Sequence, residues 1–287
     1  MANTSTPTLT LLSQHGSFGG TVNIYSHASQ QCQCTMKFAV YIPPQAKLHP
    51  VPILYFLSGL TCTEQNFITK AGAQRYAADH GLMLVAPDTS PRGEGVPDEE
   101  GWDFGSGAGF YVDATAAPWA SHYRMYSYVT EELPSLIHEN FEVNPQRQGI
   151  FGHSMGGHGA LVCGLRNPDK YQSISAFAPI ANPMQCSWGQ KALGKYVGPD
   201  PSAWPAYDAS ALVADYGSTD RHILIDQGLD DSFLEQQQLK PEAFQAACEA
   251  AGQPLTLRMQ AGYDHGYYFI ATFMEDHIKH HGQVLCG

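Results

Sequence analysis

Short apolar runs alternate with segments of helical periodicity along most of this chain of 287 residues. Apolar and polar side chains alternate over residues 36–42, as they do in a strand with one buried face. Residues 51–57 and 82–86 are instead continuous apolar runs, which are typical of central parallel strands covered on both faces. Between these two runs, residues 74–80 have helical character. This first part of the chain therefore already combines strands with an intervening helix.

The same alternation continues to the end of the chain. Apolar runs predict strands, and helical periods predict helices, over residues 123–139 (helix), 148–151 (strand), 157–165 (helix), 173–177 (strand), 222–226 (strand), 240–251 (helix), 256–260 (strand) and 267–281 (helix). Strands that alternate with helices at this spacing predict a mostly parallel sheet with right-handed crossovers. Because no linker, repeat or low-complexity tract interrupts the pattern, we expect one doubly wound α/β domain over residues 1–287.

The most informative short motif lies where a predicted strand meets a predicted helix. Residues 152–156 read Gly-His-Ser-Met-Gly, a G-x-S-x-G motif between strand 148–151 and helix 157–165. In that context the motif predicts a nucleophile elbow, a sharp turn that presents the Ser154 hydroxyl to a substrate. Gly152 and Gly156 leave room for the turn, and the following helix directs free N–H groups and its positive dipole end at the same point. The motif therefore indicates a serine hydrolase.

Two further groups follow later strands, as a general base and its acid should in such a sheet. His265 comes between Asp264 and Gly266, after strand 256–260 and before the last helix, which predicts that it is the general base. Three aspartates crowd the segment before it. Asp226 lies within or at the end of its strand, too early to turn toward the histidine, whereas Asp230 and Asp231 both lie in the following loop. The residue pattern does not choose between these two.

Motifs spread over nearly the whole chain resemble those of the S-formylglutathione hydrolases of the esterase D group. They occupy residues 55–63, 86–93, 102–105, 107–115, 123–129, 152–159, 262–265 and 267–269. In that family the catalytic acid is the Asp two residues before a Phe-Leu pair. Asp231 matches, because Ser232, Phe233 and Leu234 follow it. The resemblance thus implies the α/β-hydrolase fold, commonly as a homodimer, and hydrolysis of S-formylglutathione to glutathione and formate in glutathione-dependent formaldehyde removal.

Acyl-transfer chemistry adds two backbone donors to this site. The tetrahedral intermediate carries an oxyanion that needs fixed hydrogen-bond donors. One is the N–H of Met155, directly after the nucleophile, and the other is expected from the loop after strand 51–57, where Ser58 and Gly59 let the Leu60 N–H point inward. No step requires a metal or an organic cofactor, so neither is expected.

Three side chains are expected to bind substrate. The family resemblance places the Cys62 thiol beside the active serine, although a buried structural cysteine is an equally good interpretation. By analogy, Trp102 in a glycine-rich aromatic segment and Trp188 are expected to form walls of the acyl or glutathione pocket.

Other histidines and cysteines are interpreted as structural. His277, His280 and His281 have helical spacing, but they lack acidic or cysteine partners of a metal site, so a solvated helix face is predicted. The Cys32-x-Cys34 pair predicts no redox or metal site. His153 and His158, in and just after the elbow, are expected to serve packing.

Composition and charge exclude several classes of partner. The net charge is −12 with only 15 Lys and Arg, which argues against a nucleic-acid partner. No basic amphipathic anchor and no run of 18 apolar residues points to a membrane. The first basic residue is Lys37, so no signal peptide is expected at residues 1–12, and seven scattered cysteines suit a reducing cytoplasm.

Two alternatives to a thioester hydrolase remain open from the sequence. The same triad would serve a general carboxylesterase that acts on short acyl esters, since only the substrate pocket separates the two activities. A non-catalytic relative that binds a ligand or a protein partner would require a broken triad, and this triad is complete in the sequence.

Overall fold

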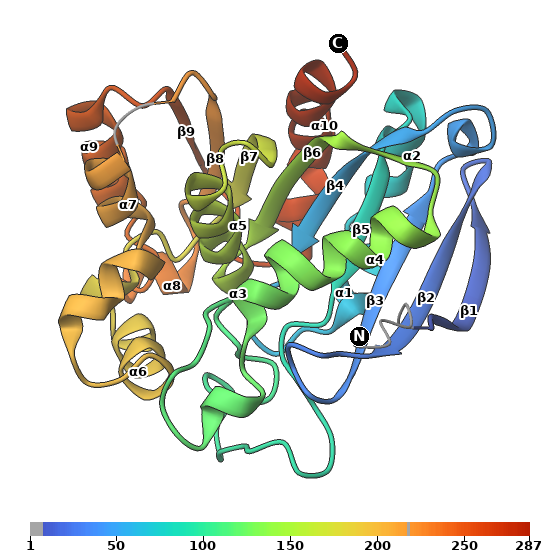
Figure 1. The fold of residues 1–287 in the computed structure, drawn as a ribbon. Helices are drawn as coiled ribbons and strands as arrows, with labels where there is room; N and C mark the ends of the chain where they lie inside the picture. Colours follow the sequence, from blue (N-terminus) through green and yellow to red (C-terminus); the bar gives the residue numbers. More distant parts are fainter. Residues whose placement is uncertain (1–7, 217–218) are drawn as a thin grey trace.

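The computed structural model describes residues 8–216 and 219–287, so residues 1–7 of the N-terminal segment considered above lie outside it. The described residues form one nine-stranded sheet in the order β1-β2-β3-β5-β4-β6-β7-β8-β9 (Figure 1). Its strands are β1 (Thr10–Ser17), β2 (Gly20–Ala28), β3 (Thr35–Ile42), β4 (Val51–Leu57), β5 (Met83–Pro87), β6 (Val143–His153), β7 (Tyr171–Phe177), β8 (Ile223–Gly228) and β9 (Leu255–Gln260).

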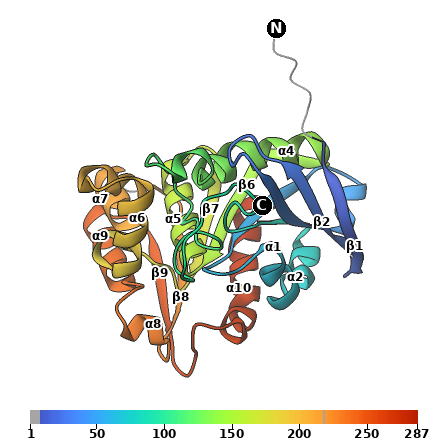
Figure 2. The ribbon, with the colours of Figure 1, turned by 90° about the horizontal axis from the view of Figure 1, so that it is seen from below.

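Helices cover both faces of this sheet. In Figure 2, α4 and α5 lie on one face, whereas α1, α2 and α10 lie on the other. The α-helices are α1 (Glu64–Lys70), α2 (Ala73–His80), α3 (Met125–Ser127), α4 (Leu133–Asn140), α5 (Met155–Arg166), α6 (Ser187–Tyr196), α7 (Ala209–Tyr216), α8 (Ser232–Glu235), α9 (Pro241–Ala251) and α10 (Tyr267–Leu285). Helices on both faces explain why the central strands are continuous apolar runs, and every residue of β5 is buried.

Most of the sheet is parallel, as the sequence predicts. Strands β5, β4, β6, β7, β8 and β9 pair in parallel, whereas β1, β2 and β3 pair antiparallel and β3 joins β5 antiparallel. Together with the flanking helices, this arrangement confirms the predicted α/β-hydrolase fold. The arrowheads of β4 and β6 point to the lower part of Figure 1, where α8 also lies. The carboxyl ends of the parallel strands therefore face that side of the molecule.

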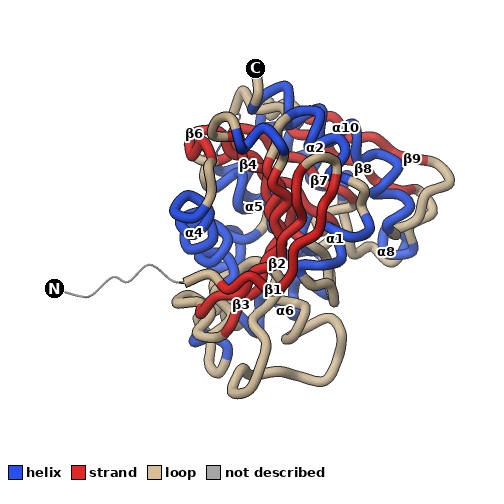
Figure 3. The backbone as a smooth tube through the Cα atoms, turned by 90° about the vertical axis from the view of Figure 1, so that its right-hand side faces the viewer, coloured by secondary structure: helices blue, strands red, loops and turns tan. Residues whose placement is uncertain are grey.

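Strands β1 and β2 extend the sheet beyond the predicted elements. β1 is the edge strand nearest the viewer in Figure 3, and its residues are exposed or only partly buried. With no buried face, it has no alternation of apolar and polar residues that would predict a strand. Its conformation comes from pairing with β2.

The helix predicted over residues 123–139 is interrupted. The chain is helical from Met125 to Asn140, but a π-helical turn over Tyr128–Glu132 separates α3 from α4. Pro134 explains the interruption, because it lacks the N–H that would bond the carbonyl of Thr130 in a regular helix. That carbonyl instead accepts a hydrogen bond from Lys170.

The prediction of a solvated face on α10 is wrong. His277 and His281 are fully buried, and His280 is partly buried. His277 binds the Asp226 carboxylate at 2.9 Å, and His281 bonds the hydroxyl of Ser173 at 2.6 Å. The histidine face of α10 therefore packs on polar side chains of β7 and β8, which the spacing within α10 does not reveal.

Candidate active site

Ser154 occupies a strained turn between β6 and α5. Its φ is +58° and its ψ is −120°, values that cost a non-glycine residue about 1–3 kcal/mol. Glycines on either side make the turn possible. A Cβ on Gly152 would lie 2.2 Å from the carbonyl oxygen of Gly156, and a Cβ on Gly156 would lie 1.9 Å from that of Leu57. The local structure is therefore the elbow that the sequence predicts.

His265 and Asp231 meet at the carboxyl ends of β8 and β9. The Nδ1 atom of His265 lies 2.5 Å from Oδ2 of Asp231. The carboxylate is buried and also accepts hydrogen bonds from the backbone N–H of Phe233 at 2.8 Å and from Gln227 at 3.1 Å. Burial alone would raise the pKa of Asp231, but the contact with His265 and these hydrogen bonds hold it below its ordinary value. Asp231 is thus an anion beside the imidazole.

The other two aspartates of the segment lie elsewhere. Asp230 is exposed, and among the described residues it forms no salt bridge with His265, which pairs with Asp231 instead. Asp226 is buried and binds the Arg258 guanidinium, with 2.8 Å between Arg258 Nε and Oδ1, and it also binds His277. The structure therefore separates two neighbouring loop aspartates that the residue pattern left equivalent.

Ser154 and His265 line the same pocket, whose volume is about 240 Å³. Its other lining residues are Gly59, Leu60, Thr61, Cys62, Trp102, His153, Trp188, Phe233 and Tyr267. The pocket thus contains the three side chains expected to bind substrate, together with the serine and the histidine. A serine and a histidine at one pocket, with an ionised carboxylate that contacts the histidine, are the kinds of side chain that serine hydrolases use.

The loop after β4 approaches Ser154 closely. A Cβ on Gly59 would lie 3.0 Å from the Ser154 Cβ. Any larger residue at position 59 would therefore crowd Ser154. The Tyr111 hydroxyl donates to the carbonyl of Ser58 at 2.8 Å, and the Thr61 N–H donates to the carbonyl of Gly107 at 2.9 Å. These bonds hold the loop beside the nucleophile, where the Leu60 N–H is expected to act.

Neither expected oxyanion donor is engaged within the described part of the chain. The N–H of Leu60 and the N–H of Met155 have no hydrogen-bond acceptor among the described residues. Met155 begins α5, so its N–H belongs to the first turn of a helix, where amides lack partners within the helix. Both groups are therefore free to bind an anion.

Comparison with known proteins agrees with this geometry. The chain matches the model of the family described as "Putative esterase" over residues 29–280. It is 60% identical to S-formylglutathione hydrolase of Mus musculus, with 96% of this chain and 98% of the relative covered. It is 52% identical to S-formylglutathione hydrolase of Paracoccus denitrificans, with 96% and 97% covered. The chain belongs to the S-formylglutathione hydrolase family of esterases.

Solved structures support the same membership. The S-formylglutathione hydrolase of Agrobacterium tumefaciens superposes with a TM-score of 0.94 at 52% identity, over 96% of this chain and 99% of that one. A fluorophosphonate-binding serine hydrolase of Staphylococcus aureus has a TM-score of 0.72 at 20% identity, over 92% of this chain and 98% of that one. At that identity the second likeness shows the fold alone.

In this member of the family, an aromatic wall lines one side of the pocket. The Trp102 and Trp188 ring centroids are 5.2 Å apart, and those of Trp188 and Phe233 are 4.8 Å apart. Phe233 also meets the His265 ring edge to face at 4.9 Å. Phe233 and Tyr267 also line the pocket, although they were not among the pocket residues expected from the sequence. Their positions beside Asp231 and His265 in the family motifs were the available signal.

Cys62 lies in the pocket, but its surroundings favour the neutral thiol. Burial raises the pKa of Cys62, and only part of that rise is offset by the nearby Lys70 charge and by Tyr267. The carbonyl of Cys62 accepts hydrogen bonds from Thr89 at 2.5 Å and from Arg92 at 3.1 Å. Cys62 therefore lines the pocket, and its carbonyl also anchors the loop after β4 to Thr89 and Arg92.

The two elbow histidines differ. His158 is fully buried, bonds the carbonyl of Phe110 at 2.9 Å, and has a pKa lowered to about 4 by burial. It packs away from the pocket lining, as expected. His153 lines the pocket, and its ring centroid is 4.4 Å from that of His265. Burial, and then the neighbouring His265, lower the pKa of His153, so it is neutral beside the base.

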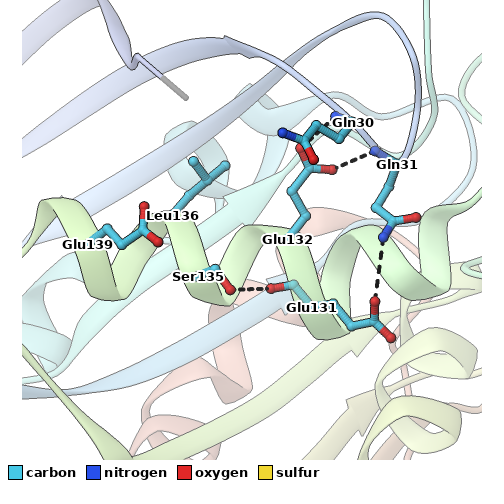
Figure 4. Close-up of a pocket in the computed structure, with 7 residues that line it drawn as sticks. All are labelled: Gln30, Gln31, Glu131, Glu132, Ser135, Leu136 and Glu139. Atoms are coloured by element: carbon cyan, nitrogen blue, oxygen red, sulfur yellow. Dashed lines mark hydrogen bonds between the residues drawn. The ribbon is translucent and has the colours of Figure 1, made fainter. Parts of the chain in front are cut away.

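An acidic hollow, shown in Figure 4, lies between the β2–β3 connection and α4. Glu131, Glu132 and Glu139 lie along it, and the backbone N–H groups of Gln30 and Gln31 donate to the Glu132 carboxylate at 2.7 and 2.9 Å. No histidine or cysteine lines it. In this hollow the Glu132 carboxylate holds the β2–β3 connection, and no histidine stands near a nucleophile as acyl transfer would require.

Over residues 8–216 and 219–287, three or more His, Cys, Asp or Glu side chains do not gather as metal ligands. In the same ranges, none of the helices combines the length and the apolar character that crossing a bilayer requires.

Proposed function

We propose that this chain hydrolyses S-formylglutathione to glutathione and formate with Ser154, His265 and Asp231 as its catalytic triad. One observation carries the proposal. His265, whose Nδ1 contacts the Asp231 carboxylate, lines one pocket with an elbow serine, in a chain 52–60% identical to curated S-formylglutathione hydrolases over nearly its whole length. Each residue has a role that follows from its position.

Acylation begins at Ser154. The free imidazole nitrogen of His265 removes the hydroxyl proton as Oγ attacks the formyl carbon of the thioester. Asp231 accepts the Nδ1 hydrogen bond, which selects the tautomer with a free Nε2 and then stabilises the imidazolium. The carbon becomes tetrahedral, and its oxygen carries the negative charge.

Backbone N–H groups stabilise that charge. The proposed donors are Met155 at the start of α5 and Leu60 in the loop after β4, and the α5 dipole adds to their effect. Losing one such donor typically costs about 3 kcal/mol of transition-state stabilisation. The two donors come from different elements, so the β4 and β6 pairing positions one against the other.

Collapse of the intermediate breaks the carbon–sulfur bond and leaves a formyl ester on Ser154. The departing glutathione sulfur takes the proton from the His265 imidazolium, which returns the imidazole to its neutral form. His265 then removes a proton from water as the water attacks the formyl ester, and it returns that proton to Ser154 Oγ as formate is released. No metal or organic cofactor takes part in these steps.

The cellular setting is part of the same proposal. We expect the reaction to serve as the second step of glutathione-dependent formaldehyde removal, in the cytoplasm, by a homodimer of single-domain chains. All seven cysteines, each within the described ranges, are free, which supports a reducing compartment. Sedimentation analysis of the purified protein tests the dimer.

A general carboxylesterase remains the second candidate, because the matched family is one of esterases and the triad is the same. The deciding experiment compares kcat/KM for S-formylglutathione, S-acetylglutathione and aryl acetates. A strong preference for the formyl thioester is expected. Equal or higher kcat/KM for the aryl esters would favour the carboxylesterase, and no turnover together with no fluorophosphonate labelling would favour a binding protein.

A further inference from the structure

Lys70 lies beside the pocket but outside its lining. It is the last residue of α1, and its ammonium is 5.6 Å from the centroid of the Tyr267 ring on α10. Tyr267 also lines the Ser154 pocket. A second hollow, of about 580 Å³, is lined by Lys70, Tyr267, Tyr268 and Ala271. Tyr267 is therefore a wall shared by the two hollows, and the Lys70 ammonium lies near its ring.

No acidic side chain among the described residues pairs with the Lys70 ammonium. Other basic groups around the pocket are paired, since Lys191 binds Asp103 at 2.7 Å and Arg92 binds Asp88 at 2.9 Å. Across the described ranges, Lys70 forms no salt bridge. Its field nevertheless reaches the pocket, because it lowers the pKa of Cys62 against the effect of burial.

We propose that Lys70 binds a carboxylate of the glutathione moiety, so that the leaving group extends from Ser154 across Tyr267 into the second hollow. The inference rests on the proposed function and adds a substrate-binding residue to it. S-formylglutathione has an uncharged formyl end and two carboxylates on its peptide arms. In a chain with a net charge of −12, an unpaired lysine offers these carboxylates a local partner.

The dimensions fit a tripeptide. The His153 ring, next to Ser154 in the chain, is 6.4 Å from the Tyr267 ring, and the Lys70 ammonium is 5.6 Å from the same Tyr267 centroid. Three extended residues span about 10 Å. Beside the aromatic wall, Lys191 lies on α6 with Trp188, and its charge is already neutralised by Asp103. The charged arm therefore has a free cationic partner on the Tyr267 side.

The test is the Lys70→Met variant of the full-length protein. We expect its KM for S-formylglutathione to rise about fivefold with kcat unchanged, since a partly exposed ion pair contributes up to about 1 kcal/mol. The uncharged thioester S-formyl-N-acetylcysteamine has no carboxylate, so its KM and kcat are expected to stay the same. Lys70→Arg keeps the charge and is expected to retain most of the affinity for S-formylglutathione.

Lys279→Met is the matched control. Lys279 is also exposed and lies on α10, but it is twelve residues beyond Tyr267, or about 18 Å along the helix. It removes the same charge from the molecule without touching the proposed site. Raising ionic strength is expected to raise the wild-type KM for S-formylglutathione and to leave that of Lys70→Met nearly flat.

Two results would overturn the inference. The first is a KM for S-formylglutathione that is the same in Lys70→Met and Lys279→Met. The second is an equal rise in KM for the charged and the uncharged thioester in Lys70→Met. Either result leaves the proposed function intact as long as the wild type hydrolyses S-formylglutathione. A wild type that fails to do so contradicts the proposed function itself.

Discussion

Ser154 has a backbone conformation that only its surroundings can maintain. The cost of its positive φ is offset by three hydrogen bonds of its own peptide groups. Its N–H donates to the carbonyl of Phe177 at 3.0 Å, and its carbonyl accepts from the N–H groups of His158 at 3.0 Å and Ile180 at 3.2 Å. The hydroxyl takes no part in this support. Its removal should therefore affect chemistry without affecting folding.

We expect Ser154→Ala to abolish turnover of thioester and ester substrates while the melting temperature stays near that of the wild type. Removing a triad nucleophile typically lowers kcat by about 10⁶-fold. His265→Ala is expected to behave alike, and the double variant to be little worse than either single one, because the two residues act as a unit. Retention of more than about a hundredth of wild-type kcat by Ser154→Ala would contradict its role.

Asp231 and Asp230 provide a matched pair of adjacent aspartates. Asp231→Asn removes the charge that faces the imidazole, so kcat is expected to fall by about 10⁴-fold. Asp230→Asn changes an exposed side chain and is expected to leave kcat within a factor of two or so. Steady-state kinetics of both variants at neutral pH decides between them. The reverse ranking would assign the acid to Asp230.

At the scale of elements, the elbow is made by β4, β6 and α5 together. Gly156 on α5 lies so close to β4 that no Cβ fits, because the carbonyl of Leu57 occupies its place. The local pattern predicts each element separately, through apolar runs and helical period. Their close approach depends on the parallel pairing of β4 with β6, in which Leu57 lies opposite Gly152. These two residues are far apart in the sequence.

Gly156→Ala is expected to destabilise the protein by about 3 kcal/mol and to lower kcat, since the overpacked elbow must shift. Gly194→Ala, at a half-buried position of α6, serves as the control. Its Cβ would lie 3.6 Å from the Trp204 ring, an ordinary contact, so the change is expected to be neutral or stabilising by up to about 1 kcal/mol. Denaturant unfolding measures both. Equal stabilities would mean that the elbow relaxes freely.

At the scale of the whole molecule, one buried polar network joins β7, β8, β9 and α10. Asp226 binds Arg258 on β9 and His277 on α10, and His277 also bonds the Ser175 hydroxyl at 2.8 Å. Burial would raise the pKa of Asp226, but His277 and Arg258 hold it below its ordinary value. Burial lowers the pKa of His277, and it lowers that of His281 strongly, so both are neutral in the folded state.

This network predicts that stability falls on the acid side. Below pH about 6.5 the histidines of the unfolded chain bind protons, whereas His277 and His281 in the folded protein do not, so the free energy of unfolding falls as pH falls. Asp226 adds a further loss below pH about 4, where the unfolded carboxyl is protonated first. Urea unfolding at pH 7.5, 6.5 and 5.5 measures the effect. A free energy of unfolding that stays constant over this range would contradict the prediction.

The sequence by itself determined the parallel strands, most of the helices between them, and the candidate nucleophile and base, because these depend on local patterns and on strand-to-helix context. Motif resemblance added Asp231. Only the tertiary structure decided that Asp231 faces His265 and Asp230 does not, that the α10 histidines are buried, and that Phe233, Tyr267 and Lys70 stand at or beside the pocket. These facts depend on which elements pack together and where their side chains point, and residues distant in the chain set both.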